Sequence, residues 1–283
     1  SENKKVFFSR AGNRVDFTHI DSKIKNIYCD ISSLVIIDSL DLFENIFTKF
    51  ETIYIPMNTM EYINKNASIT TLKKELSYYI KQRKIFFTDE LSEDDLNEES
   101  LVYPLEKSLK YILKTMLQSN SIILFDDRAI NKYFKTDKAN VFTINDLLYT
   151  LFQSSILSKD IDYQKLLLLR EKKLLFIPFS EDELIYHLIN AKIENNKLVE
   201  TNELRIMRKH FAFTIQYLQY LSIKNKDVNM SEIPIFTNIN KVIENIYYEL
   251  WNIDRDKWDI YVNYLEENFY TLNLGYFLKD AVD

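Results

Sequence analysis

The first half of the chain alternates short apolar runs with longer segments whose apolar residues recur every three or four positions. The short runs predict buried strands, and the longer spacing predicts amphipathic helices. Strands are expected at the start of 25–37 and in 51–56, 84–88, 121–125 and 139–143, with helices in 38–50, 57–65, 69–83, 103–120, 126–137 and 144–154. Strands that alternate with helices form parallel sheets covered by helices. We therefore expect an α/β domain over residues 24–160.

The pattern changes after residue 160, where long helical periodicities dominate. Residues 163–180 predict a helix, a turn and one strand ending near Pro178, and the chain beyond Ser180 predicts helices. At the other end, residues 5–20 predict one or two short strands. The expected organisation is an N-terminal strand segment over 1–23, the α/β domain over 24–160 and a mainly helical extension over 161–283.

Composition removes several classes of protein. Only two glycines occur among 283 residues, so no Gly-rich phosphate loop is possible, which excludes Rossmann dinucleotide-binding proteins, P-loop nucleotide hydrolases and protein kinases. The net charge is −6, so any contact with nucleic acid must be local or assisted by metal ions. The single cysteine, Cys29, excludes disulfides and cysteine-type zinc sites; it is expected to be a packed core thiol.

The same features predict a cytoplasmic protein with no membrane association. One cysteine is typical of a reducing compartment, no apolar run approaches a membrane span, and the amino end carries no signal-peptide pattern. Because the chain begins with Ser1 and not with Met, we expect it to be trimmed or cut from a longer protein.

Carboxylates stand where three of the predicted strands end. Asp30 closes "NIYCD", Glu61 lies on the first helical turn after Pro56, and Asp126 and Asp127 follow "SIILF". In an open parallel sheet, ligands bind beyond the carboxyl ends of the strands. Acids gathered there repel one another unless cations neutralise them, and hard oxygen ligands select Mg²⁺ or Mn²⁺. The sequence therefore predicts a site for Mg²⁺ or Mn²⁺.

Over residues 24–155 this set resembles the PIN-domain nuclease family, in a bacterial subgroup with additional C-terminal elements. The resemblance depends on the Asp after the first strand, on a Glu five residues after a strand-ending Pro in "IPMNTMEYI", on "LFDDRAINKYF" and on the closing "ANVFTINDLLYTLF". It implies metal-dependent hydrolysis of phosphodiesters, with RNA favoured over DNA as substrate. The catalytic residues that it implies are Asp30, Glu61, Asp126 and Asp127.

The resemblance leaves the fourth acidic ligand open. Asp30, Glu61 and Asp127 match the family pattern directly, whereas Asp126 and Glu106 compete for the remaining place and Asp146 is the third contender. Cations near the acid pair could hold a nucleic acid by its phosphates; they are Lys107, Lys110, Lys114 and Arg128.

Each acid also has a structural alternative. Asp30 could cap the turn that follows it, Glu61 could favour a helix start through the helix dipole, and Asp126 or Asp127 could cap the next helix. A protein whose acids were only caps would be an interaction module, and one with an incomplete metal site would be a catalytically inactive PIN-like scaffold. The C-terminal helices could bind a protein partner or form a homo-oligomer.

Overall fold

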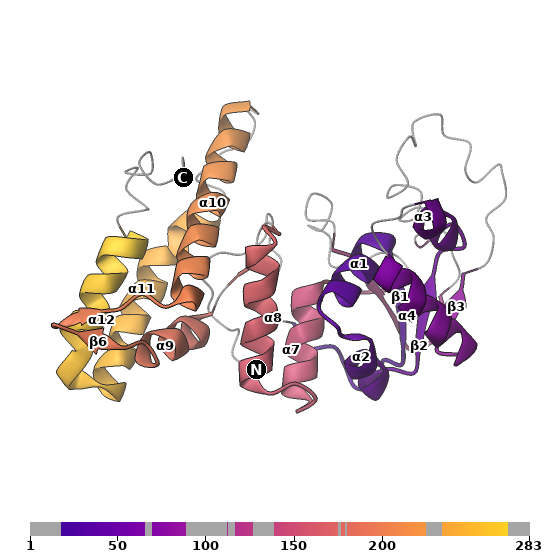
Figure 1. The fold of residues 1–283 in the computed structure, drawn as a ribbon, viewed down its shortest axis with the longest axis horizontal. Coiled ribbons are helices and arrows are strands. Elements are labelled where there is room, and N and C mark those ends of the chain that lie inside the picture. Colours follow the sequence, from indigo (N-terminus) through magenta and orange to yellow (C-terminus); the bar gives the residue numbers. More distant parts are fainter. Residues whose placement is uncertain are drawn as a thin grey trace. The chain divides into compact units, whose positions relative to one another are not determined.

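The structure, a computed structural model, describes residues 18–65, 70–88, 112, 117–126, 139–174, 177–178, 180–224 and 234–270 (Figure 1). The chain divides after Asp162 into two compact units. Within the described residues, no helix is both long and apolar enough to cross a membrane.

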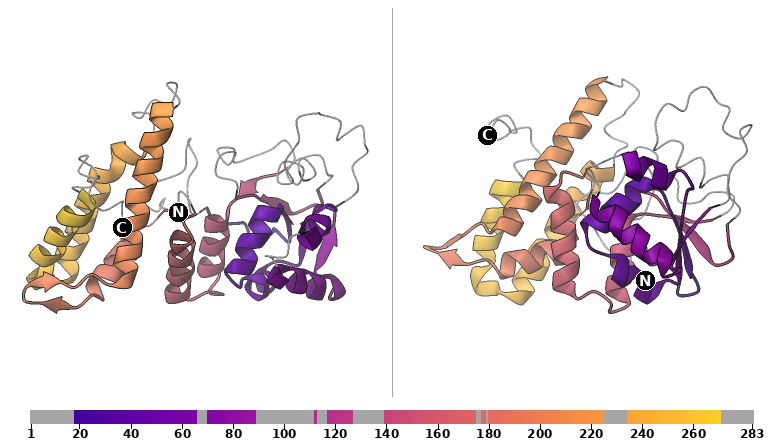
Figure 2. Two further views of the ribbon diagram at one scale, coloured as in Figure 1. Left: turned by 45° about the horizontal axis from the view of Figure 1, so that its top comes forward. Right: turned by 45° about the vertical axis from the view of Figure 1, so that its right-hand side comes forward.

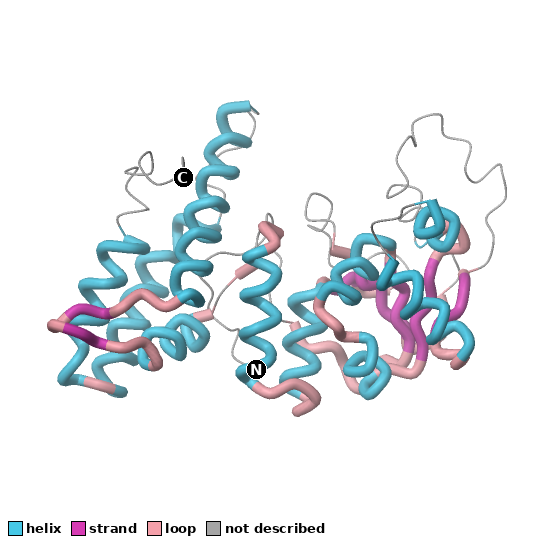
Figure 3. Tube along the Cα trace, viewed as in Figure 1, coloured by secondary structure: helices cyan, strands magenta, loops and turns pink. Residues whose placement is uncertain are grey.

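The described part of residues 18–162 forms a parallel five-stranded sheet flanked by helices (Figures 1 and 3). The strand order is β3 (Ile85–Phe87), β2 (Thr52–Ile55), β1 (Asn26–Cys29), β4 (Ser121–Leu124) and β5 (Val141–Phe142). The helices are α1 (Ile31–Ser39), α2 (Phe43–Lys49), α3 (Thr59–Lys65), α4 (Thr70–Lys81) and α7 (Ile144–Gln153). The expected α/β class is therefore confirmed.

The register assigns the side chains of the sheet to two faces. Ile27 is aligned with Ile53 and with Ile122 on the neighbouring strands, and all three are buried. One residue further along, Tyr28 stacks on Tyr54 with ring centroids 4.7 Å apart. Because successive residues of a strand point to opposite faces, the sheet has an aliphatic face and a face that carries stacked aromatic rings. Cys29 is fully buried, as expected of a packed core thiol.

The apolar run after β1 is a helix and not a continuation of the strand. Its Ile and Val residues favour a strand when they are taken alone, but Asp30 caps the run, which forms α1 with Leu34 and Ile37 fully buried. The next predicted helix, 38–50, is shorter than expected: α2 begins only at Phe43, after a turn in which Asp41 has a φ of 51°.

Helices make up most of the described chain beyond Asp162, and they pack around their own apolar core. The elements are α8 (Lys159–Glu171, which begins before the division), α9 (Glu181–Ile189), β6 (Ile193–Glu194), β7 (Lys197–Leu198), α10 (Asn202–Lys224), α11 (Pro234–Ile253), the 3₁₀ turn Arg255–Lys257, α12 (Trp258–Leu265) and the π-helical turn Glu266–Tyr270. Helices α11 and α12 lie side by side (Figures 1 and 2).

Two features of this unit differ from expectation. The predicted strand near Pro178 is wrong for the two described residues there: Ile177 and Pro178 belong to no strand, and their carbonyl oxygens accept hydrogen bonds from Arg170. The antiparallel pair β6–β7 was not expected; Asn195 and Asn196, with φ of 51° and 58°, make the turn that joins the two strands. Asn tolerates positive φ better than most residues, so it suits this turn.

Candidate metal centre

Asp30 lies directly after β1 and caps α1. Its Oδ1 accepts a hydrogen bond from the N–H of Ser33 at 3.0 Å, and its Oδ2 accepts one from the N–H of Ser32 at 3.2 Å and another from the Ser32 hydroxyl. The side chain is fully buried. The structural alternative for Asp30 is thus realised, and it fixes the carboxylate at the carboxyl end of the central strand.

Burial raises the pKa of Asp30 above its ordinary value, and hydrogen bonds from Ser32 and Ser33 oppose this rise. Desolvation disfavours the charged form of a carboxyl, whereas donors that point at the carboxylate favour it. A cation beside Asp30 would lower this pKa, as the hydrogen-bond donors do. The site is therefore one in which binding a cation and ionising the acid would support each other.

Asp126 is a second buried carboxylate, two residues after β4. Its side chain is only 5% exposed, and its Oδ1 accepts a hydrogen bond from the N–H of Ile144, the first residue of α7, at 3.1 Å. Cys29 is aligned with Leu124 in the parallel register, so Asp30 and Asp126 follow neighbouring strands at the same edge of the sheet. That edge is the usual place for ligands in an open α/β sheet.

Asn145 lies next to Ile144 and was not predicted as a site residue. Its side chain is fully buried, and neither its amide oxygen nor its amide nitrogen has a hydrogen-bond partner among the described residues. Buried amides are nearly always paired, so an unpaired one indicates a missing partner. In the sequence Asn145 looks like an ordinary polar residue at the start of the predicted helix 144–154, so no sequence signal identified it.

Further unpaired polar atoms lie after β2 and β3. The hydroxyls of Thr59 and Thr88 are buried and have no hydrogen-bond partner among the described residues, and the same holds for Oδ1 of Asn58. Thr88 follows β3 directly, and Thr59 begins α3. Unpaired oxygens therefore accompany the carboxyl ends of several strands.

Asp146, the third contender for the fourth ligand, acts as part of a helix cap. Its Oδ1 accepts from the N–H of Thr18 at 2.8 Å, and its Oδ2 accepts from both the N–H and the hydroxyl of Thr143 at 2.9 Å. Together with the bond from its own N–H to the Thr143 hydroxyl, this is a capping box at the start of α7. Both oxygens of Asp146 accept hydrogen bonds, as those of Asp30 do, but Asp146 lies within the first turn of α7 and not at the end of a strand, so we assign it a structural role.

Glu61 lies in the first turn of α3, but its side chain is on the surface. It is 65% exposed and forms an ion pair with Lys65 Nζ at 2.5 Å, four residues further along the helix. In this arrangement Glu61 does not join the buried carboxylates. A ligand role would require its carboxylate to leave Lys65.

The remaining predicted site residues lie outside the described part of the chain. They are Asp127, Glu106, Lys107, Lys110, Lys114 and Arg128, and their roles remain predictions. Within the described residues, no three or more His, Cys, Asp or Glu side chains are grouped closely enough to hold a metal ion. What the described residues do provide is two buried carboxylates and an unpaired amide oxygen, a set of hard donors that fits Mg²⁺ or Mn²⁺ better than a soft metal.

No protein-family model, curated protein or solved structure matches this chain.

Proposed function

We propose that this protein is a nuclease of the PIN-domain kind, which uses Mg²⁺ or Mn²⁺ to hydrolyse phosphodiester bonds, with RNA favoured over DNA. One observation carries the proposal: Asp30 and Asp126 are both buried at the carboxyl ends of neighbouring parallel strands. The strand order β3-β2-β1-β4-β5 with flanking helices is compatible with a PIN-like fold. The preference for RNA comes from the resemblance of the sequence motifs to that family.

The residues that would hold the ion are Asp30, Asp126 and the amide oxygen of Asn145, joined by Asp127 and by Glu106 from outside the described residues. The bound ion would supply an activated water molecule and would neutralise the charge that develops on the phosphate. Two neighbouring carboxylates repel each other without such an ion, which supports a cation as their natural partner.

The contribution of the chain itself is to fix these donors. The backbone N–H groups of Ser32 and Ser33 hold the Asp30 carboxylate in place, and that of Ile144 holds Asp126. Side chains positioned by backbone donors lose little freedom when they bind a ligand, and preorganisation of this kind is what an electrostatic site needs.

The nearby thiol is not a nucleophile. The pKa of Cys29 is raised well above its ordinary value, first by burial and then by the charge of Asp30. A buried, protonated thiol neither attacks a phosphate nor binds a metal readily. Hydrolysis by water is therefore the reaction that this edge of the sheet favours.

A cleavage assay tests the proposal. Labelled single-stranded RNA and DNA are incubated with the protein in Mn²⁺ or in EDTA. We expect Mn²⁺-dependent cleavage, faster on RNA, and its loss in Asp30→Asn and in Asp126→Asn. Glu51→Gln is the matched control, because Glu51 is an exposed acid at the opposite, amino-terminal end of β2. Equal cleavage by wild type and Asp30→Asn would refute the proposal.

A second candidate function is a PIN-like scaffold without catalysis. The pairing of Glu61 with the exposed Lys65 favours it, since an intact site would use this acid. The two functions predict different responses to Lys65→Met. In a nuclease that recruits Glu61, removing this lysine should increase the affinity for Mn²⁺ and Glu61→Gln should reduce it. In a scaffold, neither change should affect Mn²⁺ binding.

A further inference from the structure

Helix α11 has aromatic residues on the face opposite to its core contacts. Ile243, Ile246 and Leu250 are buried in the core of the unit beyond Asp162. Tyr248 and Trp251 lie three residues apart on the other face, and they are 66% and 40% exposed. Because residues three and four apart share one face of a helix, Glu244 precedes Tyr248 on the same line.

Arg255 continues this line beyond the end of the helix. Helix α11 ends at Ile253, so helical spacing does not place Arg255; its contact with Trp251 does. The guanidinium carbon of Arg255 lies 4.3 Å from the centre of the Trp251 ring, and Trp258 meets the same ring edge-on at 5.4 Å. We call Glu244, Tyr248, Trp251 and Arg255 the aromatic stripe.

The composition of the stripe is that of a binding surface. Trp, Tyr and Arg are the residues most enriched among those that dominate binding energy in protein interfaces. A single exposed aromatic needs no explanation, whereas adjacent ones on one helix face indicate an interaction site. Trp251 packs edge-on against Trp258, yet it stays 40% exposed, and Tyr248 beside it is 66% exposed.

We infer that the aromatic stripe joins two copies of this chain, with α11 packed antiparallel against its counterpart about a two-fold axis. Glu244 lies one helical turn before Tyr248, and the Arg255 guanidinium lies against Trp251 at the other end of the stripe. An axis midway between Tyr248 and Trp251 therefore pairs Glu244 with Arg255 of the partner subunit and Tyr248 with Trp251 of the partner subunit. In a two-fold interface each pair occurs twice.

Charge favours a second copy over other partners. The stripe carries one acid and one base at its two ends, which is complementary to itself only when reversed. Exposed acids near it, Glu249 and Asp256, oppose an RNA. One helix pair is a small interface, so the dimer should be weak and should dissociate on dilution.

Sedimentation velocity on the full chain over a range of concentrations tests the interface. We expect a reversible monomer–dimer equilibrium. Trp251→Ala should raise the dissociation constant by about thirtyfold, as expected for a residue central to an interface. Tyr78→Ala is the matched control, since Tyr78 is 55% exposed in the other unit, and it should leave the equilibrium unchanged. Melting temperatures measured in parallel show that each variant is folded.

Charge reversal tests the pairing itself. Glu244→Arg and Arg255→Glu should each weaken the dimer by about fivefold, because each places like charges opposite each other. The double variant should recover most of the wild-type affinity. A chain that stays monomeric at its highest soluble concentration, or a double variant that dimerises no better than the single ones, would overturn the inference. Neither result depends on nuclease activity, so this inference and the proposed function can fail separately.

Discussion

The N–H of Ile144 donates a hydrogen bond of 3.1 Å to Oδ1 of Asp126, eighteen residues earlier in the chain. The bond connects the first residue of α7 to the end of β4, and it leaves Asn145 as the next residue along, buried and with an unpaired amide. The residue after the donor to Asp126 thus carries a buried, unpaired amide. The proposed metal site would depend on this connection as much as on its acids.

Asn145→Ala should separate metal binding from folding. The substitution removes no hydrogen bond that the described residues make, so without metal the free energy of unfolding should fall by less than about 2 kcal/mol. The rise in melting temperature on adding Mn²⁺ should shrink. Asp146→Asn should behave in the opposite way: it loses helix-cap contacts and is less stable, yet keeps its response to Mn²⁺. A full Mn²⁺ response in Asn145→Ala would exclude this amide from the site.

The stability of the Asp30→Asn variant relative to the wild type should increase as the pH rises. Because burial raises the pKa of Asp30 in the folded protein, that state keeps a proton which the unfolded chain releases at lower pH. The wild type therefore loses stability as the pH rises from the ordinary pKa of 3.8 through the raised value. Asn still caps the helix and does not titrate. In EDTA, the melting temperature of the variant should rise relative to that of the wild type over this pH range. A difference in melting temperature that does not change with pH would contradict this prediction.

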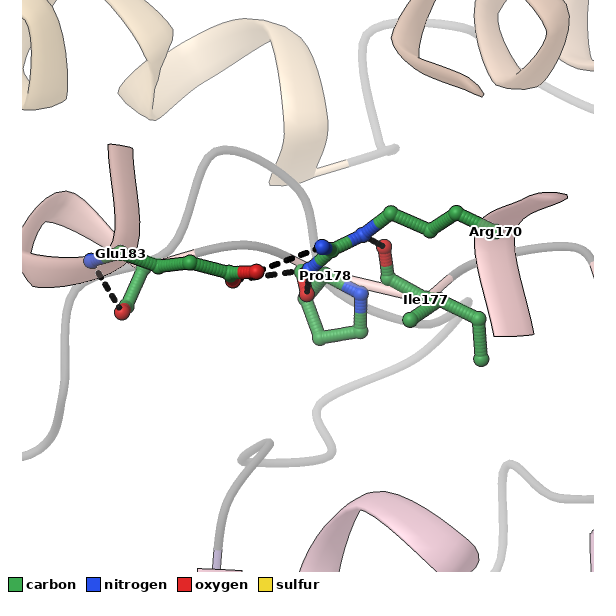
Figure 4. A network of polar contacts seen from close by, with 5 residues as sticks. Arg170, Ile177, Pro178 and Glu183 are labelled. Carbon is green, nitrogen blue, oxygen red and sulfur yellow. Dashed lines mark hydrogen bonds and ion pairs between the residues drawn. The ribbon is translucent and has the colours of Figure 1, made fainter. Parts of the chain in front are cut away.

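Arg170→Met should be among the most destabilising single changes in the unit beyond Asp162. Arg170 Nη1 contacts Glu183 Oε1 at 2.6 Å with both side chains fully buried, and its guanidinium also binds the carbonyls of Ile177 and Pro178 (Figure 4). Removing one member of a buried pair leaves a buried charge, which costs about 3–5 kcal/mol. Urea unfolding measures this cost.

The matched control for this change is Lys25→Met. Lys25 pairs with Glu51 at 3.3 Å, but both side chains are largely exposed, so its loss should change stability by no more than about 1 kcal/mol. The double variant Arg170→Met/Glu183→Leu should recover only part of the loss, since the carbonyls of Ile177 and Pro178 stay unpaired. Equal effects of Arg170→Met and Lys25→Met would show that the buried pair does not hold this unit together.

The wild type should lose stability on mild acidification, and His187→Gln should remove this loss. Burial lowers the pKa of His187 below its ordinary 6.5, with Glu183 opposing and Arg170 adding to the shift. The unfolded chain then binds a proton that the folded state refuses, so stability is full above pH 6.5 and falls as the pH drops through 6.5 toward the lowered value. Between about pH 7.5 and about pH 5.5, the melting temperature of the variant should decrease less than that of the wild type. Equal decreases in the two proteins would contradict this prediction.

The parts of the fold that the sequence predicts best are those set by local pattern. Apolar runs that end in an acid correctly placed Asp30 and Asp126 beyond strands of a parallel sheet. The helix after β1 was harder to predict, because its Ile and Val residues favour a strand when the cap from Asp30 is not considered. The turn at Asn195 and Asn196 had a sequence signal in its two adjacent asparagines.

Other features depend on contacts that no local pattern contains. In the sequence, Asn145 looks like an ordinary residue of an amphipathic helix. Only the fold shows that its amide is buried and has no partner among the described residues. The chain from Ile177 to Pro178 has the composition of a strand, but the guanidinium of Arg170 binds its carbonyls. The position of Glu61 in the first turn of α3 was predictable, whereas its pairing with Lys65 depends on the direction of its side chain.

Metal binding by the pair of buried carboxylates is the central claim, and the Mn²⁺ dependence of the melting temperature tests it most directly. An ion that binds only the folded state raises the melting temperature. We predict a rise for wild type in Mn²⁺ relative to EDTA, a much smaller rise for Asp30→Asn and for Asp126→Asn, and a full rise for Glu51→Gln. No rise in wild type, or an equal rise in Asp30→Asn, would contradict the account.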